Sequence, residues 1–485
     1  MNRTPEPPGP SNPHVPSRVT LAGARAVALL LVFAARSPTT RGAEARQAVA
    51  APPRVAIVGA TLIDGTGGPP LTDMTVLISG GRITAVGTRV ATPVPGGART
   101  IDGRGKFLIP GLWDMHVHLS KAGEGALPLF IANGVTSVRD MGGDADLLLR
   151  WRTETAAGTR VGPRVKTPGQ MLESAKNVAR MKSDGTVEPV DRYRRPVGTA
   201  EDAERTVAEL AAKGVDFIKV RTRESPEAYR AILEAAARHH LTVVGHPTAG
   251  IDAVIDAGQR SVEHALIPPV SGRSDEARAA LFSRMAGQGI VSVPTLVVGT
   301  KSLLVASGDA AKIVDDVHGA IDSRRQYVGG YLIADWREQV GERDDASRQA
   351  LEKLAPLIRK DLSDMRKAGV QIMPGTDTAV VLIYPGFSLH DELDLLVSEI
   401  GMTPMEAIVA ATRHPAEFFG MQETLGTVQV SKMADLVLLD ASPLDRIGNT
   451  RAIHAVVAGG RLYTRRDLDG LLQKSAAAAT AAVVR

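Results

Sequence analysis

Between residues 112 and 375 the sequence alternates short runs of apolar, often β-branched residues with longer segments whose apolar residues recur at helical spacing. Helical segments such as 200–213 and 226–239 separate these short runs. Strands that alternate with helices form parallel sheets, and eight repeats close a (β/α)8 barrel, the TIM-barrel architecture. The eight strands are expected at 112–118, 135–140, 164–167, 217–220, 242–246, 261–264, 290–294 and 370–375.

β-rich segments lie on both sides of this barrel, which is predicted to span 109–424. Segments 51–108 and 425–468 each contain short strands and hairpin turns, but neither is large enough to bury a core alone. They are therefore expected to pack together as one small composite β-sandwich domain built from both chain ends.

Two further segments carry expectations of their own. The connection 296–367, before the eighth strand, is longer than one helix requires. Two structures are compatible with its length: a lid over the site, or extra helices on the barrel wall. The Ala-rich segment 469–485 is predicted to be a flexible tail.

Charge and cysteine content exclude several classes of function. Residues 1–50 contain six Arg and two acidic residues and so hold the whole formal net charge of +4. The remaining 435 residues carry 51 basic and 51 acidic groups without a basic cluster, so nucleic-acid binding is not expected. The chain has no Cys, which excludes disulfides, thiolate nucleophiles and Cys-ligated zinc.

The leader, residues 1–50, resembles a signal peptide in its order of segments. Basic residues precede an apolar run at 26–35, and small and polar residues follow it. A run of this length is about half of the roughly 20 residues that a membrane-spanning helix needs. The leader predicts export to a periplasmic or extracellular location, without a stable membrane anchor.

A set of His, Lys and Asp residues falls at the ends of the predicted strands. His116 and His118 close the first strand, and their i, i+2 spacing points both imidazoles into the barrel mouth. Barrel enzymes carry their catalytic groups at these strand ends, and His with carboxylate suits a divalent metal, zinc best of all. The other members are Lys219 on the fourth strand, His246 on the fifth, His264 on the sixth and Asp377 after the eighth.

This arrangement resembles the amidohydrolase superfamily, in particular its binuclear branch of imidazolonepropionase-like and Xaa-Pro dipeptidase-like hydrolases. The phrases that carry the resemblance extend over 54–465 and are Leu108-Ile-Pro-Gly-Leu-Trp-Asp-Met-His-Val-His118, Ser261-Val-Glu-His264, Gly375-Thr-Asp377, Gly386-Phe-Ser-Leu-His-Asp-Glu392 and Ala434-Asp-Leu-Val-Leu-Leu-Asp440.

The resemblance implies a role for each residue of the set. His116, His118 and Asp377 would hold one divalent ion, and His246 and His264 a second, more exposed one. Lys219, carboxylated by CO2, would bridge both ions as a carbamate. A water bridging the ions would lose its proton near neutral pH and attack an amide carbonyl, and Asp377 would pass that proton to the leaving amine.

Substrate identity is less constrained by the sequence. The expected reaction is hydrolysis of a C–N bond in a small molecule, with a dipeptide or N-acyl amino acid as the first candidate. Arg221 could bind a substrate carboxylate or pair with a neighbouring acid, while His390, Tyr384 and, more weakly, Arg139 are further candidates near the mouth.

Other functions remain open on the same barrel. A lactone, carbamate or phosphotriester is an alternative substrate. A mononuclear deaminase is disfavoured, because such enzymes lack the bridging lysine and carry a Glu shortly after the fifth-strand His, whereas His246 is followed by Pro-Thr-Ala-Gly. A non-catalytic scaffold is least favoured because the ligand set is complete, and homo-oligomerisation stays open.

Overall fold

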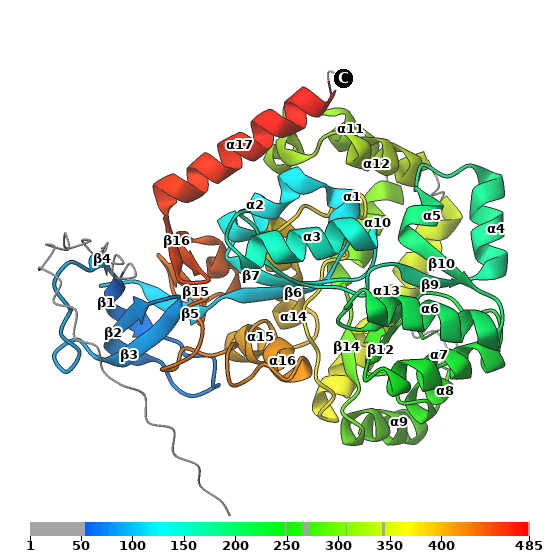
Figure 1. The fold of residues 1–485 in the computed structure, drawn as a ribbon, viewed down its shortest axis with the longest axis horizontal. Helices are drawn as coiled ribbons and strands as arrows, with labels where there is room; N and C mark the ends of the chain where they lie inside the picture. Colours follow the sequence, from blue (N-terminus) through cyan, green and yellow to red (C-terminus); the bar gives the residue numbers. More distant parts are fainter. Residues whose placement is uncertain are drawn as a thin grey trace, which may run out of the picture. The chain divides into compact units, whose positions relative to one another are not determined.

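The computed structural model describes residues 54–247, 250–264, 270, 272–306, 308–341 and 345–483. The predicted signal peptide in residues 1–50 lies outside the described residues. Figure 1 shows helices around a central set of strands, with a separate sheet formed by the blue and red-brown ends of the described chain.

That separate sheet joins the two chain ends, as predicted for the composite domain. Its order is β17-β16-β15-β5-β1-β2-β3, with β4 paired to β1. The register of β15 on β5 is antiparallel, from Leu436 opposite Pro110 to Leu439 opposite Phe107. The strands are β1 Arg54–Leu62, β2 Leu71–Ser79, β3 Arg82–Thr88, β4 Arg99–Asp102, β5 Phe107–Pro110, β15 Leu436–Leu439, β16 Ile453–Ala458 and β17 Arg461–Thr464.

Strand β15 explains why this sheet packs beside the barrel. Leu436 and Leu438 belong to the core within the terminal domain, whereas Val437 and Leu439 belong to the core shared with the barrel helices. Alternate side chains of a strand point to opposite faces, so all four can be apolar and buried.

The barrel contains seven of the eight predicted strands as regular strands. They pair in parallel, in the groups β6-β7-β8 and β11-β12-β13-β14. Two further strands, β9 and β10, were not predicted and extend the second group beyond β11. The strands are β6 Leu112–Val117, β7 Val135–Asp140, β8 Arg164–Lys166, β9 Met171–Ser174, β10 Arg194–Val197, β11 Ile218–Val220, β12 Val243–Gly245, β13 Ser261–Glu263 and β14 Val291–Val293.

The eighth predicted strand, 370–375, closes the ring through separate hydrogen bonds and isolated bridges. Ser292 N–H donates to Gln371 O at 2.9 Å, and Met115 N–H donates to Pro374 O at 2.9 Å. The other opening is spanned by Asp216 N–H, which donates to Thr167 O at 2.9 Å. The barrel architecture is therefore confirmed, with an irregular last strand.

Helices cover the outside of the barrel, and local sequence signals place their ends. Helix α6 begins with a capping box of Thr199 and Asp202, and α7 begins with Ser225 as N-cap and Pro226 as its first residue. Among the described helices, none combines the length and apolar character that crossing a bilayer requires. Apart from those of 296–367 and the C-terminus, the helices are α1 Leu119–Ala122, η1 Glu124–Ala126, α2 Leu127–Ala132, α3 Ala145–Ala156, α4 Ala175–Asp184, α5 Val190–Tyr193, α6 Ala200–Ala212, α7 Pro226–Arg238, α8 Ile251–Asp256, α9 Asp275–Gly287, α14 Phe387–Ser398, α15 Pro404–Ala410, α16 Arg413–Phe418 and η3 Ile447–Arg451.

The long connection 296–367 forms additional helices that pack on two parts of the barrel domain. Its C-terminal half packs on the barrel wall through Leu362 and Met365, while its earlier helices pack on the loop after Asp377, where Trp336 Nε1 donates to Ala379 O at 2.9 Å. Its helices are α10 Leu296–Ala306, α11 Asp309–Asp315, η2 Ser323–Tyr327, α12 Tyr331–Gly341 and α13 Asp345–Lys367.

The prediction of a flexible tail over 469–485 is wrong for its described part. Residues Arg465–Val483 form one helix, α17, which lies along α2 (Figure 1). Leu468 is buried in the shared core, and Ser475 Oγ donates to Gly125 O at 3.0 Å. Small Ala side chains let this helix lie close to its neighbours, and Ala has the highest helix propensity.

Candidate metal centre

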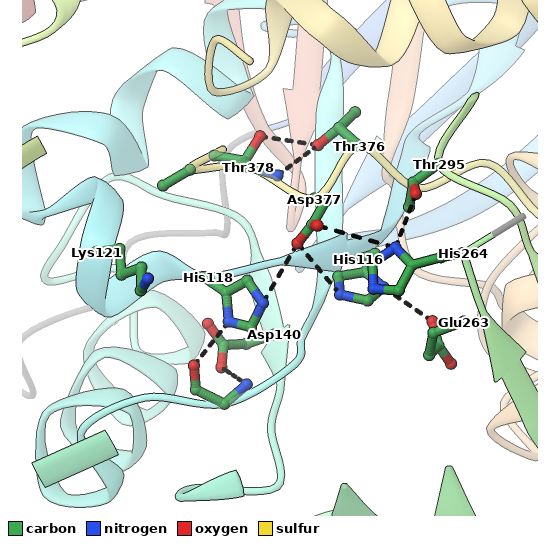
Figure 2. Close-up of polar contacts among 12 residues, drawn as sticks. His116, His118, Lys121, Asp140, Glu263, His264, Thr295, Thr376, Asp377 and Thr378 are labelled. Atoms are coloured by element: carbon green, nitrogen blue, oxygen red, sulfur yellow. Dashed lines mark hydrogen bonds and ion pairs between the residues drawn. The ribbon is translucent and has the colours of Figure 1, made fainter. Parts of the chain in front are cut away.

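His116 and His118, at the end of β6, are oriented by partners on their Nδ1 atoms. His116 Nδ1 lies 2.9 Å from Glu263 Oε2, and His118 Nδ1 lies 2.8 Å from Gly142 O. Both partners are acceptors, so the proton of each neutral ring sits on Nδ1 and Nε2 is left as a ligand atom. The Nε2 atoms lie 3.4 and 3.3 Å from Asp377 Oδ1 (Figure 2).

Asp377 reaches this position because the eighth segment packs directly against β6. Asp377 N–H donates to His116 O at 2.7 Å. A Cβ on Gly375 would lie 2.8 Å from His116 Cβ, so only glycine permits this approach.

His246 and His264 form a second pair at the ends of β12 and β13. Their Nε2 atoms lie 3.1 Å apart, and His264 Nδ1 lies 2.9 Å from Thr295 Oγ1. Two ligand atoms on one tetrahedral zinc, at about 2.0–2.1 Å each, lie roughly 3.3 Å apart. The separations within both groups therefore suit ligands of a shared cation.

The two groups adjoin each other. His264 Nδ1 lies 3.8 Å from Asp377 Oδ2, and His116, His264 and Asp377 each offer a ligand atom within 4.8 Å of the others. The rings of His116 and His264 have centroids 4.7 Å apart. The structure thus brings together the five His and Asp residues that the sequence singled out.

Backbone strain concentrates at the same place. His264, Thr295 and Asp377 have φ angles of 65°, 48° and 57°, in the left-handed region that non-glycine residues rarely occupy. Such conformations cost on the order of 1–3 kcal/mol each and cluster at functional sites, where the surrounding structure holds them.

Lys219, on β11, is buried beside these residues with 1% of its surface exposed. Its Nζ has no hydrogen-bond partner among the described residues. Burial lowers the pKa of Lys219 to about 8, and its charge contributes, after burial, to the lowered pKa of His246. A buried ammonium group without a hydrogen-bond partner is costly, so burial favours the uncharged amine.

The Glu263 side chain that contacts His116 Nδ1 is itself part of a buried ion pair. Arg139 Nη2 lies 2.7 Å from Glu263 Oε2, and both side chains are fully buried. Arg139 also donates through Nε to Met115 O at 2.6 Å and through Nη1 to Ser261 Oγ at 2.9 Å. The expectation that Arg139 lies near the mouth is therefore wrong, because its guanidinium is held inside the barrel.

Glu263 was not singled out from the sequence, although a signal was present. It lies two residues after Ser261 on a strand whose three residues are all buried, so it faces inward with Ser261. An acid at an inward position of a barrel strand requires a buried partner, here Arg139 and His116.

The predicted substrate residues differ in their placement. Arg221 pairs with the buried Glu173, Nη1 to Oε2 at 3.1 Å, and keeps 37% of its side chain exposed. His390 is buried, with Nδ1 at 2.9 Å from Thr450 Oγ1 and Nε2 at 3.1 Å from Asn133 O.

Tyr384 is also fully buried, in a core cluster with Trp336, and its ring lies under the guanidinium of Arg324. The structure therefore does not bring His390 and Tyr384 to the surface of the mouth, because the chain after Asp377 turns both side chains into the interior.

The family of the chain follows from a match that covers this whole region. Residues 107–463 match the Amidohydrolase family. The chain belongs to that family. Its members are metal-dependent hydrolases that act on C–N bonds, so the coarse function predicted from the strand-end residues is confirmed.

Individual relatives in this family share about a quarter of their residues with the chain. Ochratoxinase of Aspergillus niger is 28% identical over 466 residues, covering 84% of this chain and 87% of that protein. Imidazolonepropionase of Myxococcus xanthus is 26% identical over 422 residues, covering 80% and 90%. The structure of A. niger ochratoxinase aligns with a TM-score of 0.63 at 26% identity over 85% of this chain and 96% of that one.

The crystal structure of a Xaa-Pro dipeptidase with methionine bound in its active site aligns with a TM-score of 0.66 at 21% identity. It covers 85% of this chain and 100% of that one, and it supports the shared fold.

Proposed function

We propose that this protein is a binuclear, carbamate-containing hydrolase of amide bonds in dipeptides or N-acyl amino acids. The observation that carries the proposal is the buried amine of Lys219, which has no hydrogen-bond partner among the described residues. It lies beside two groups of ligand atoms at coordination spacing. His116, His118 and Asp377 would hold one divalent ion, and His246 and His264 would hold the other. A carbamate on Lys219 would be a ligand of both ions. Zinc suits these donors best.

Divalent ions bound there would acidify a water molecule and polarise the scissile carbonyl. The chain's own contribution is positioning and proton transfer. Asp377 Oδ1 faces His116 and His118, so Oδ2 is the oxygen placed to accept a proton and return it to the leaving amine. Glu263 and Gly142 fix the two imidazoles of β6, which keeps their Nε2 atoms aimed inward.

The proposed substrate class rests on Arg221 and on what the relatives act on. Ochratoxinase and the dipeptidase bear names of enzymes that act on ochratoxin and on Xaa-Pro dipeptides. Arg221 stands two residues after Lys219 with part of its guanidinium exposed, and Glu173 fixes one side of it. A substrate carboxylate could accept two N–H bonds from the remaining edge. The order of segments in the leader, residues 1–50, supports a periplasmic or extracellular place of action.

Elemental analysis of purified protein tests the metal and carbamate parts together. Protein prepared with zinc and bicarbonate should hold close to two ions per chain, and Lys219→Ala should hold fewer. A panel of dipeptides and N-acyl amino acids then tests the reaction by amine release. One ion or none in folded wild-type protein, unchanged by Lys219→Ala, would overturn the binuclear proposal.

Arg221→Met is the matched test of the substrate class. It should raise KM for substrates with a free carboxylate and leave the corresponding carboxamides nearly unaffected. Equal effects on both series would remove the carboxylate-binding role.

A further inference from the structure

An open cavity of about 210 Å3 begins at His264 and Thr295 and extends between three helices. Its walls are Leu296 and Val298 on α10, with further side chains from α13 and α14. Figure 2 shows His264 and Thr295 on the side of the centre opposite Lys121. The cavity thus adjoins the proposed metal centre on the side of His264 and Thr295.

The side chains of this cavity are mainly apolar and incompletely covered. Leu351, Ala355 and Ile358 on α13 and Leu395 on α14 are all half-buried, as are Leu296 and Val298. Concave apolar surface that stays accessible beside a reactive centre is typical of ligand pockets. An apolar occupant would complete the burial of these side chains.

The charged groups of the lining are already paired. Arg359 Nε on α13 forms an ion pair with Oε2 of Glu399, the C-cap residue of α14. The pair joins the two helices that form the cavity walls, and it offers no isolated charge to an ionic ligand. Gly299, also in the lining, leaves open space where a Cβ would stand.

The volume sets the size of the occupant. A cavity of about 150 Å3 lined by aliphatic and aromatic side chains is large enough for benzene. The larger cavity here accepts a single ring with room for a small substituent.

We infer that this cavity, the α10–α13 pocket, binds an apolar acyl group of the substrate, the size of one aromatic ring. The inference rests on the proposed function. His264 belongs to the proposed metal centre, whose ions would polarise the scissile carbonyl, and its side chain keeps 16% exposure next to the pocket. The group attached to that carbonyl therefore lies beside the pocket, while Arg221 would bind the amino-acid part. Amino acids whose amino group carries an aryl-substituted acyl chain, the N-arylacyl amino acids, combine both of these groups.

Two substrates that differ only in this group test the inference, N-phenylacetyl-L-alanine and N-acetyl-L-alanine. Burying the ring should raise kcat/KM about 10- to 100-fold over the acetyl compound. Ala355→Phe fills the pocket and should remove most of this ratio, and Leu351→Gln should reduce it without adding volume. Ala350→Phe places the same ring on an exposed position of α13 and is the matched control. Thermal unfolding of each variant confirms that it is folded.

Calorimetric binding of phenylacetohydroxamate and acetohydroxamate to zinc-loaded protein separates the two levels of the proposal. A preference for the phenyl compound that Ala355→Phe removes and Ala350→Phe retains would support the pocket even where no amide is cleaved. Amide hydrolysis with equal rates for both substrates, unchanged in Ala355→Phe, would overturn the pocket and leave the proposed function standing. Absence of hydrolysis across the panel would overturn the proposed function alone.

Discussion

Removal of one partner from the buried Arg139–Glu263 pair should destabilise the protein strongly. Arg139→Met keeps most of the side-chain volume but leaves the buried Glu263 carboxylate without its guanidinium partner. Breaking a buried ion pair from one side typically costs about 3–5 kcal/mol. Met115 O and Ser261 Oγ each lose a hydrogen bond as well, at 2.6 and 2.9 Å in the wild-type protein. We therefore expect the free energy of unfolding to fall by about 4 kcal/mol.

The same pair should affect metal binding through His116. Burial by itself would raise the pKa of Glu263, but the charge of Arg139 and the hydrogen bond with His116 hold it well below its usual range. Without Arg139, protonation of Glu263 becomes easier and its hold on His116 Nδ1 weakens. Loss of such a partner of a metal-binding His commonly costs about 10- to 100-fold in metal affinity. Competition with a zinc chelator measures this loss.

The double variant Arg139→Met/Glu263→Gln separates charge from packing. It removes both charges, and the amide oxygen of the introduced glutamine can still accept the His116 N–H, so most of the lost stability should return. Urea unfolding at neutral pH provides the three free energies, and Arg150→Met is the control because its pair with Glu154 is 3.9 Å long and exposed. The reasoning is refuted if Arg139→Met costs less than about 1 kcal/mol, or if the double variant is no more stable than the single one.

Three further predictions concern residues outside the metal centre. Burial raises the pKa of Glu392 from 4.5 to about 8, so the folded protein binds this proton more tightly than the unfolded chain. The free energy of unfolding should therefore fall as pH rises between these values. Urea unfolding across that range should show a flatter pH profile for Glu392→Gln. His390→Ala removes hydrogen bonds to Thr450 and Asn133 and should lower stability by about 2–4 kcal/mol at unchanged metal content, whereas loss of turnover without loss of stability would restore its substrate role. Trp336→Phe removes the bond to Ala379 O and should cost about 1–2 kcal/mol in thermal unfolding, with an effect below a few tenths showing that α12 does not anchor the loop after Asp377.

The sequence specified the barrel because strand and helix periodicities alternate clearly from Leu112 onward. It did not reveal β9 and β10, since both contain charged residues that look incompatible with burial. Glu173 on β9 and Arg194 on β10 are nevertheless buried, because they pair with each other at 2.6 Å. The burial of each charge is compensated only because the two residues lie next to each other on neighbouring strands. The sequence of either strand alone does not reveal this pairing.

The predicted metal ligands, which the structure brings together, differ in one physical respect from His390 and Tyr384, which it buries. A residue at the end of a barrel strand has its direction set by the pleat, so His116 and His118 could be placed without any knowledge of their neighbours. Tyr384 follows Asp377 on an irregular loop and His390 on helix α14, so their closeness to Asp377 in sequence does not fix the direction of their side chains. Their side chains point to η3 and α12, because those elements offer hydrogen bonds and apolar contacts.

Glu263 and Arg139 show what regular spacing alone leaves undetermined. Spacing predicts that both face inward from β13 and β7, yet it does not say that they meet across the barrel. Their meeting makes an otherwise unfavourable acid and base mutually compatible, and it fixes the ring of His116 at the same time. The strand ends therefore carry the chemistry that a sequence can suggest, while the layer beneath them, which holds that chemistry in place, depends on the closed barrel.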